Sequence, residues 1–411
     1  MAILKSRAIG RKILRQVRTS YWFWPSTLVL GALCLAALVE WVDTQPGLMR
    51  DVLPNWLTAI DPDGARDTLS TLATAVIGVA GVMFSMTLVA VSFAADTFGP
   101  RLIGNFMRDR GTQISFGLLL GTFVFNIVML RSVQGGDAAF VPYAGLTMAL
   151  FLALFSVFTI IYYIHHVPET INVSNISSDL GHQFSASIRE LIAGRAKIEV
   201  EDVRPALNAQ EIGVTLAARG YIQQLDTDAL HNCACDNDWI IQVERSAGEF
   251  ITPHTDVLTV LTVSPLTDKQ ITVLQSAFAT GNDRTEVQST AYFADQLVEM
   301  IARALSPGFN DPFTAMNCLN WLHAGLQDAL LHDGGLKPLT TQRVRYPHLD
   351  FPALFAVSFG AALPYTVTDR MCRARHLALT QELLTRATGR NRDVIAALVP
   401  ALRAGPRERA L

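Results

Sequence analysis

Residues 72–95 read LATAVIGVAGVMFSMTLVAVSFAA, an apolar run that contains no charged side chain. A helix of about 20 such residues is long enough to cross the ~30 Å hydrocarbon core of a bilayer. Three further apolar runs lie at 21–39, 114–130 and 141–164. The sequence therefore predicts an α-helical polytopic membrane domain with four spans.

The composition agrees with a chain that is only partly embedded in a membrane. Half of the 411 residues are hydrophobic and 17% are charged, whereas soluble domains carry about 25% charged residues. The apolar runs end near residue 165, so we expect a water-soluble α+β domain to follow. A net charge of −3 gives no electrostatic case for binding nucleic acid.

The orientation of the spans follows from the Lys and Arg residues in the short flanking segments. Six precede the first span and three, Arg101, Arg108 and Arg110, lie between the second and third, whereas the 43–68 connection has two amid five aspartates. The positive-inside rule then places both termini in the cytoplasm. Five scattered cysteines do not form a secreted disulfide framework, which agrees with a reducing compartment.

The second span carries a narrow stripe of small and polar residues. At 100° per residue these positions fall within an arc of about 60°, and they extend over about 33 Å of helix. The stripe consists of Thr74, Gly78, Gly81, Ser85, Ser92 and Asp96.

Two interpretations of the stripe remain open. Small residues allow helices to approach closely, and helical hydroxyls bond to their own preceding turn. Alternatively, several copies of this helix surround an aqueous path, with Asp96 as a fixed charge at the cytoplasmic mouth. In the second case Arg101, Arg108 and Arg110 are candidates for an ion-attracting vestibule, although they also suit contact with anionic lipid.

The third span contains a second sequence of small residues. Gly117 and Gly121 form a G-x-x-x-G pattern, which favours close helix contact. Asn126 lies on the opposite side of the same helix and needs a polar partner in hydrocarbon, so we expect this span to touch protein on both faces.

After residue 168, hydrophobic periodicity divides the chain further. We expect a connecting helix and a small β module at 169–265, with strands near 220–226, 239–243, 248–251 and 256–260. A helical domain at 266–404 and a frayed tail at 405–411 complete the chain. His231, Cys233 and Cys235 lie within five residues of one another, but structural zinc normally needs four ligands, so we expect no metal and no cofactor.

The turn ALSPGFNDP, at residues 304–312, separates two of the predicted helices. Pro307 and Gly308 end one helix and Asp311 caps the next, which accounts for the residue types. A ligand role is the alternative, because a helix amino terminus with free N–H groups can hold an anion. The candidate residues of this cytoplasmic loop are Arg303, Asn310 and Asp311, although the Asp311 carboxylate would oppose an anion.

This turn and FGPRLIGNFMRDR, at residues 98–110, together resemble a family of predicted bacterial inner-membrane proteins classed as a domain of unknown function. The resemblance covers nearly the whole chain and implies a location in the bacterial inner membrane. It carries no catalytic residue. The sequence also contains no P-loop, G-x-S-x-G or H-E-x-x-H pattern, so we do not expect an enzyme.

The sequence thus favours an oligomeric inner-membrane ion channel or pore-like transport protein. Its second span would line the path, and its cytoplasmic domain would assemble or gate it. The expected partners are membrane lipid and further copies of the chain, with ions as the candidate transported species. The alternative is a non-conducting, membrane-anchored sensor or scaffold in which the stripe only packs helices.

Overall fold

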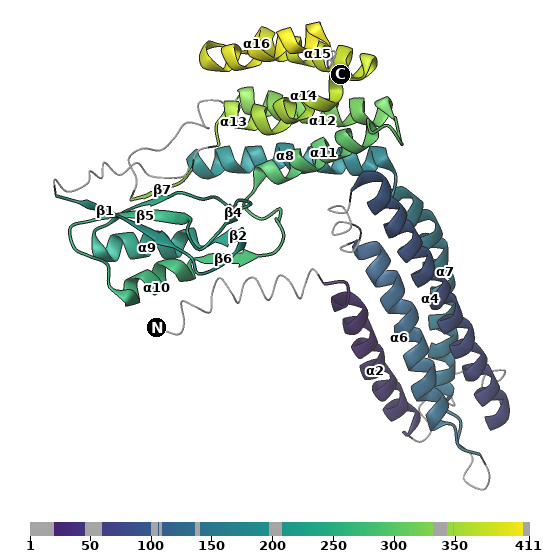
Figure 1. The fold of residues 1–411 in the computed structure, drawn as a ribbon. Coiled ribbons are helices and arrows are strands. Elements are labelled where there is room, and N and C mark those ends of the chain that lie inside the picture. Colours follow the sequence, from purple (N-terminus) through teal and green to yellow (C-terminus); the bar gives the residue numbers. More distant parts are fainter. Residues whose placement is uncertain are drawn as a thin grey trace. The chain divides into compact units, whose positions relative to one another are not determined.

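The computed structural model contains two compact units, one within residues 15–172 and one within residues 173–411 (Figure 1). It describes residues 20–45, 60–99, 106, 109–135, 140–196, 208–331, 343–347 and 349–405. Arg101 and Arg108 lie outside these residues, as do the basic amino-terminal segment and almost all of the predicted tail.

The first unit is a bundle of four helices, each long and apolar enough to cross a membrane. They are α2 (Phe23–Asp43), α4 (Pro62–Phe98), α6 (Arg110–Ser132) and α7 (Tyr143–Thr170). α6 lies at the centre, because it packs against each of the other three. The prediction of four spans followed by a mixed α and β region is confirmed.

α4 begins ten residues before the apolar run that predicted it. The Asp61 side chain accepts a hydrogen bond from the Gly64 backbone at 3.1 Å, and Pro62 occupies the first helical position. Both features favour a helix start. Hydropathy does not detect this first part of α4, because Asp61, Asp63, Arg66 and Asp67 are charged.

Acidic side chains at the end of α2 hold one end of the bundle together. The two carboxylate oxygens of Asp43 accept bonds from the backbone of Ala144 and Gly145, each at 2.9 Å, at the first turn of α7. Ser132, at the end of α6, donates to Glu40 at 2.5 Å. Between the helices lie fully buried apolar side chains such as Phe125 and Met129.

The second unit contains a stack of helices (Figure 1). The long members are α8 (Val173–Ala196), α11 (Thr290–Ala304), α12 (Pro312–Leu331), α15 (Arg370–Arg386) and α16 (Gly389–Ala404). Shorter pieces are α13 (Phe351–Phe355), a π-helical turn at Ala356–Gly360 and α14 (Ala361–Thr366). Gly181 and Gly325 bring α8 and α12 close, because a Cβ atom at either would meet Trp321 or Phe184 within 2.6 Å.

The β module of this unit has two sheets. One has the order β1 (Gln210–Thr215), β5 (Asp256–Thr262), β3 (Ile240–Val243) and β7 (Val344–Arg345), and only the β3–β7 pair is parallel. The other has the order β4 (Phe250–Ile251), β2 (Gly220–Leu225) and β6 (Phe278–Gly281). Helices α9 (Thr227–Asn237) and α10 (Asp268–Ser276) complete the module.

The four expected strands correspond to β2, β3, β4 and β5, whereas β1, β6 and β7 were not anticipated. β6 and β7 come from beyond residue 265, where the sequence placed the end of the module. Both are short, of four and two residues, so neither shows the alternation that identifies a strand.

Candidate functional site

The stripe on α4 faces away from the other three helices. All six of its residues are exposed on the surface of the bundle, and a Cβ atom added at Gly78 or Gly81 would meet nothing within 4 Å. The opposite face of α4 packs inward, where Val76, Ala80 and Met83 form a cluster with Leu119 and Tyr163. Among the described residues, no helix of the bundle therefore covers the stripe from Thr74 to Ser92.

The buried face of α4 is fixed by polar as well as apolar contacts. The Tyr163 hydroxyl donates to the Met83 carbonyl oxygen at 2.7 Å and lies 2.5 Å from the Thr87 hydroxyl. These bonds join α7 to α4 inside the bundle. They set the rotation of α4 about its axis and thereby keep the stripe on the outside.

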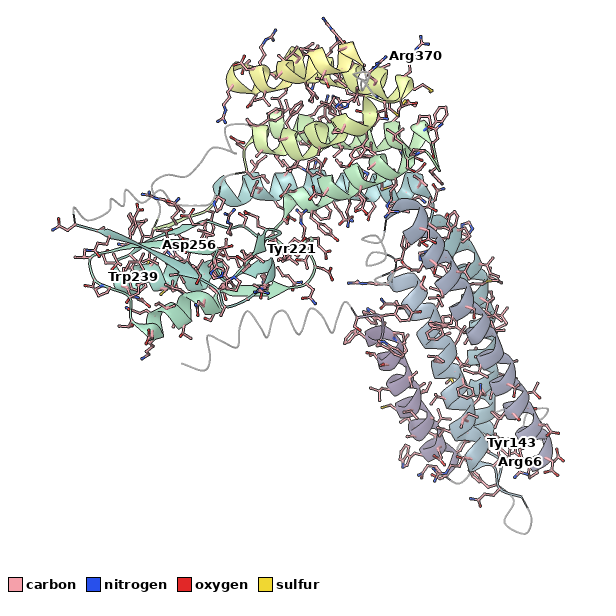
Figure 2. All side chains as sticks on the ribbon, in the orientation of Figure 1. Arg66, Tyr143, Tyr221, Trp239, Asp256 and Arg370 are labelled. Atoms are coloured by element: carbon pink, nitrogen blue, oxygen red, sulfur yellow. The ribbon has the colours of Figure 1, made fainter. Side chains whose placement is uncertain are left out.

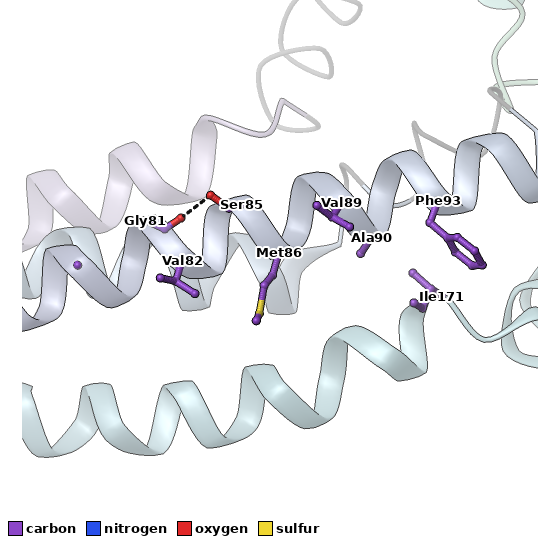
Figure 3. A pocket seen from close by; sticks show the side chains of 9 residues that line it. Gly81, Val82, Ser85, Met86, Val89, Ala90, Phe93 and Ile171 are labelled. Atoms are coloured by element: carbon purple, nitrogen blue, oxygen red, sulfur yellow. Dashed lines mark hydrogen bonds between the residues drawn. The ribbon is translucent and has the colours of Figure 1, made fainter.

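A groove of about 870 Å³ follows part of the stripe (Figure 3). It extends along α4 and reaches Ile171, the residue after α7. Val82, Met86 and Phe93 point from α4 towards the side on which Ile171 lies (Figure 3). The lining residues are Gly78, Gly81, Val82, Ser85, Met86, Val89, Ala90, Phe93 and Ile171.

The groove is mainly apolar, and its one hydroxyl is already bonded. Ser85 donates to the Gly81 carbonyl oxygen at 3.0 Å, within its own helix (Figure 3). Such a bond removes most of the cost of placing a hydroxyl in hydrocarbon. Small side chains, more than free hydrogen-bonding groups, therefore distinguish this surface from an ordinary lipid-facing helix.

The other small-residue pattern, G-x-x-x-G on α6, is used inside the bundle. A Cβ atom at Gly117 would lie 2.7 Å from the Pro25 Cα atom, and one at Gly121 would lie 3.3 Å from the Leu28 carbonyl oxygen. α2 therefore fills this seam. The expectation that α6 contacts protein on both faces agrees with its central position.

Asn126 lies on α6, within the bundle. Its side chain is fully buried, and neither amide atom has a hydrogen-bond partner among the residues that the structure describes. Thr122, one turn earlier on α6, lies 3.4 Å from the hydroxyl of Ser156 on α7.

Of the three predicted vestibule residues, the structure describes Arg110, at the amino-terminal end of α6. Arg110 is exposed, and Asp109 caps α6 by accepting a bond from the Thr112 backbone at 2.7 Å. His166 lies 2.9 Å from Asp109. Burial raises the pKa of Asp109, but the bonds from Thr112 and His166 outweigh that effect and leave the pKa below its usual value.

The ALSPGFNDP turn is held by its own hydrogen bonds. Asp311 accepts from the backbone of Phe313 and Thr314, each at 3.1 Å, which caps α12. Asn310 has a φ of 44° and donates its N–H to the Ser306 carbonyl oxygen at 3.0 Å. Arg303 lies 3.7 Å from Glu299, one turn earlier on α11.

The geometry of the turn agrees with the interpretation that its residues end α11 and cap α12. It also exposes Phe309 and Phe313, which were not among the sequence candidates. A turn signal stands beside both residues in the sequence, but only the structure shows that they are exposed.

Comparison with known sequences adds the family. The model described as "Predicted membrane protein (DUF2254)" matches residues 18–382. The chain belongs to this family. Family membership and the four apolar helices together make it a membrane protein, in contact with lipid through its spans.

Relatives of this chain occur in mycobacteria. Proteins named "uncharacterized" from Mycobacterium bovis and Mycobacterium tuberculosis are each 26% identical over 325 residues. The aligned region covers 76% of this chain and 61% of each relative, so the chain spans about three fifths of their length. No solved structure matches the chain.

The segment with His231, Cys233 and Cys235 forms part of α9. His231 and Cys235 lie one turn apart on α9, with 3.6 Å between the Nε2 and Sγ atoms. Among the described residues, no group of three or more His, Cys, Asp or Glu side chains is placed to hold a metal ion.

Proposed function

We propose that this protein assembles into an oligomer in the bacterial inner membrane and conducts ions along a path lined by α4. The observation that supports the proposal is the exposed stripe, whose residues from Thr74 to Ser92 no described helix of the bundle covers over about 27 Å of helix length. Both termini lie in the cytoplasm, and the second unit assembles or gates the path.

Helix geometry supports a lining role for α4. Its inward face is occupied by α6 and α7, and the rotation of the helix is fixed by the Tyr163 bonds. In an oligomer, the larger groove residues Val82, Met86 and Phe93 supply contact area for a neighbouring copy, while the small residues leave room for water.

Charge supports a preference for cations. Asp96 is an exposed carboxylate near the carboxyl end of α4, which the positive-inside rule places at the cytoplasmic surface. Repeated around an axis, such carboxylates concentrate cations and repel anions.

The experiment measures ion flux in liposomes and oligomer mass in mild detergent on the same preparations. Ser85→Leu adds bulk to the stripe, so we expect it to abolish flux with the mass unchanged, because a hydrophobic constriction expels water. Asp96→Asn should reduce the cation-to-anion preference without changing assembly.

Thr159→Leu is the matched control. Thr159 lies on α7, outside the groove, and its hydroxyl also bonds to its own preceding turn, at 2.9 Å from the Phe155 carbonyl oxygen. Flux and mass should both survive this change. If Ser85→Leu instead dissociates the oligomer, the stripe packs helices, and a sensor or scaffold becomes the better description. A wild-type protein without flux under any voltage, pH or salt condition would end the channel proposal.

A further inference from the structure

Three long helices of the second unit run parallel and begin at the same end of the stack. Asn317, near the start of α12, donates to the Ser177 hydroxyl near the start of α8 at 2.8 Å. The Cys372 thiol, in the first turn of α15, donates to the Pro312 carbonyl oxygen at 3.4 Å. The ALSPGFNDP turn and the turn before α15 therefore lie at the end of the stack where α8 begins.

The chain itself connects this end to the membrane. α7 is an apolar span that ends at Thr170, and α8 begins at Val173. The three Cα–Cα steps from Thr170 to Val173 span at most about 11 Å, so the first turn of α8 lies close to the point where α7 ends.

This end is also where large apolar side chains gather. Among the described residues from 290 to 404, six large hydrophobic side chains are exposed, and four of them lie in or beside these two turns. The four are Phe309 (47% exposed), Phe313 (69%), Tyr365 (41%) and Met371 (46%). The other two are Leu331, at the far end of α12, and Tyr346.

The turns hold these side chains in place. Two backbone bonds, from Asn310 to Ser306 and from Asp311 to Ala304, close the ALSPGFNDP turn at 3.0 and 2.7 Å. At the second turn, Asp369 accepts from the Cys372 backbone at 2.8 Å. Ordered turns lose little conformational entropy when their side chains enter a new environment.

We propose that this end of the second unit is a lipid-contact surface, with Phe309 and Phe313 inserted at the headgroup–acyl boundary of the bilayer. Aromatic rings favour that depth, because it accommodates an apolar body beside polar groups. Exposed Arg370, at the start of α15 (Figure 2), adds a cation that suits lipid phosphate. The proposal concerns the resting contact of this unit and does not depend on ion conduction.

Lipid is the occupant that the connectivity favours. The tether of two residues keeps this end near a bilayer surface in every copy of the chain, at a high effective concentration. Contact with a second copy of the same end would need an assembly that brings two such ends together.

The test places a polarity-sensitive fluorophore, NBD, on a single cysteine of the full-length protein. The accessible thiols are removed by Cys34→Ala, Cys233→Ser and Cys235→Ser. Cys318 and Cys372 stay, because both are buried and burial raises the pKa of each thiol to about 12. Phe309→Cys and Phe313→Cys carry the probe, in phosphatidylcholine vesicles with or without phosphatidylcholine spin-labelled near its headgroup.

Leu331→Cys is the matched control, because it lies on the same helix as Phe313, is 66% exposed and sits at the opposite end. We expect the spin-labelled lipid to quench most of the fluorescence at positions 309 and 313, and little of it at 331. Quenching should persist at high salt, since burial of apolar rings is not screened by ions.

Two results would overturn the proposal. Quenching of positions 309 and 313 by aqueous iodide, with no effect of labelled lipid, would place these residues in water. Blue-shifted emission that neither quencher reaches would indicate contact with protein, such as a second copy. Either result would leave the flux measurements on Ser85→Leu unaffected, so the two proposals fail separately.

Discussion

The bundle contains two seams of small residues, and they have opposite outcomes. On α6, Gly117 and Gly121 lie against the backbone of α2. On α4, Gly78 and Gly81 face away from every helix of the bundle, and a groove of about 870 Å³ follows them. Small residues therefore mark a helix face suited to close approach, but they do not tell whether the neighbour belongs to the same chain.

The difference has a geometric cause. α6 lies between three helices, so any small residue on its surface meets a neighbour. Among the described helices, α4 packs closely against α6 and α7 and keeps one side uncovered. Only that free side is available for lipid, for water or for another copy of the chain.

The orientation of both seams gives the largest expected effect, an all-or-none labelling result. In the proposed topology, α4 and α6 cross one bilayer in opposite directions, with both termini in the cytoplasm. A membrane-impermeant thiol reagent added to intact cells should modify Ala59→Cys and spare Arg390→Cys. Equal modification of both positions from outside would contradict this orientation of the spans.

Acidification gives the next largest expected effect, a loss of folding stability that involves neither seam of small residues. His376 is fully buried in the second unit, and desolvation lowers its pKa from 6.5 to about 4. Below pH 6.5 the unfolded chain therefore binds a proton at His376 that the native state does not bind. Above pH 6.5 this residue does not lower the free energy of unfolding. As the pH drops towards 4, the free energy of unfolding falls by about 3 kcal/mol.

Thermal melts of the full-length protein from pH 7 to pH 4 test this expectation. His376→Leu should flatten the curve, although a slope remains, because burial also lowers the pKa of His323. Thr366, the hydrogen-bond partner of His376, retains the Ala362 carbonyl oxygen as an acceptor at 3.2 Å. An undiminished slope in this variant would assign the acid sensitivity to another group.

The smallest effect, and the one that separates the seams directly, comes from a pair of glycine substitutions. Gly117→Ala forces a Cβ atom to 2.7 Å from the backbone of Pro25, so we expect a loss of about 1–3 kcal/mol of stability from overpacking. Gly81→Ala meets nothing and should add up to about 1 kcal/mol through helix propensity.

Denaturation of monodisperse protein in mild detergent gives both values for the glycine pair. Equal destabilisation by the two variants in a monomeric preparation would mean that α4 also has a close neighbour in the protomer, which would contradict the exposed stripe.

Particular residues explain how far sequence reasoning reached. The spans were predictable because a bilayer requires long, uninterrupted apolar helices. β2 and β5 were predictable because each has apolar residues bounded by turn signals. β7 was not, since Val344 and Arg345 form a strand only by pairing with β3 from about a hundred residues earlier.

The candidate site divides in the same way. The stripe could be identified by its period of 3.6 residues, and the residue types of the ALSPGFNDP turn fit helix punctuation. Asp109 was missed as a site residue, because its bond with His166 joins positions 57 residues apart. Phe309 and Phe313 were missed for a similar reason. Their significance depends on α8, α12 and α15 beginning at one end, which the sequence does not express.

The sequence by itself determined which segments are apolar enough to cross a membrane as helices, and where small residues line one face of such a helix. These properties depend on neighbours three or four positions away, so periodicity and composition encode them directly. Only the tertiary structure decided that α2 fills the α6 seam and that the α4 stripe stays exposed. That outcome depends on the rotation of each helix about its own axis. Contacts between distant residues fix this rotation, such as the bond from Tyr163 to Met83, 80 residues earlier.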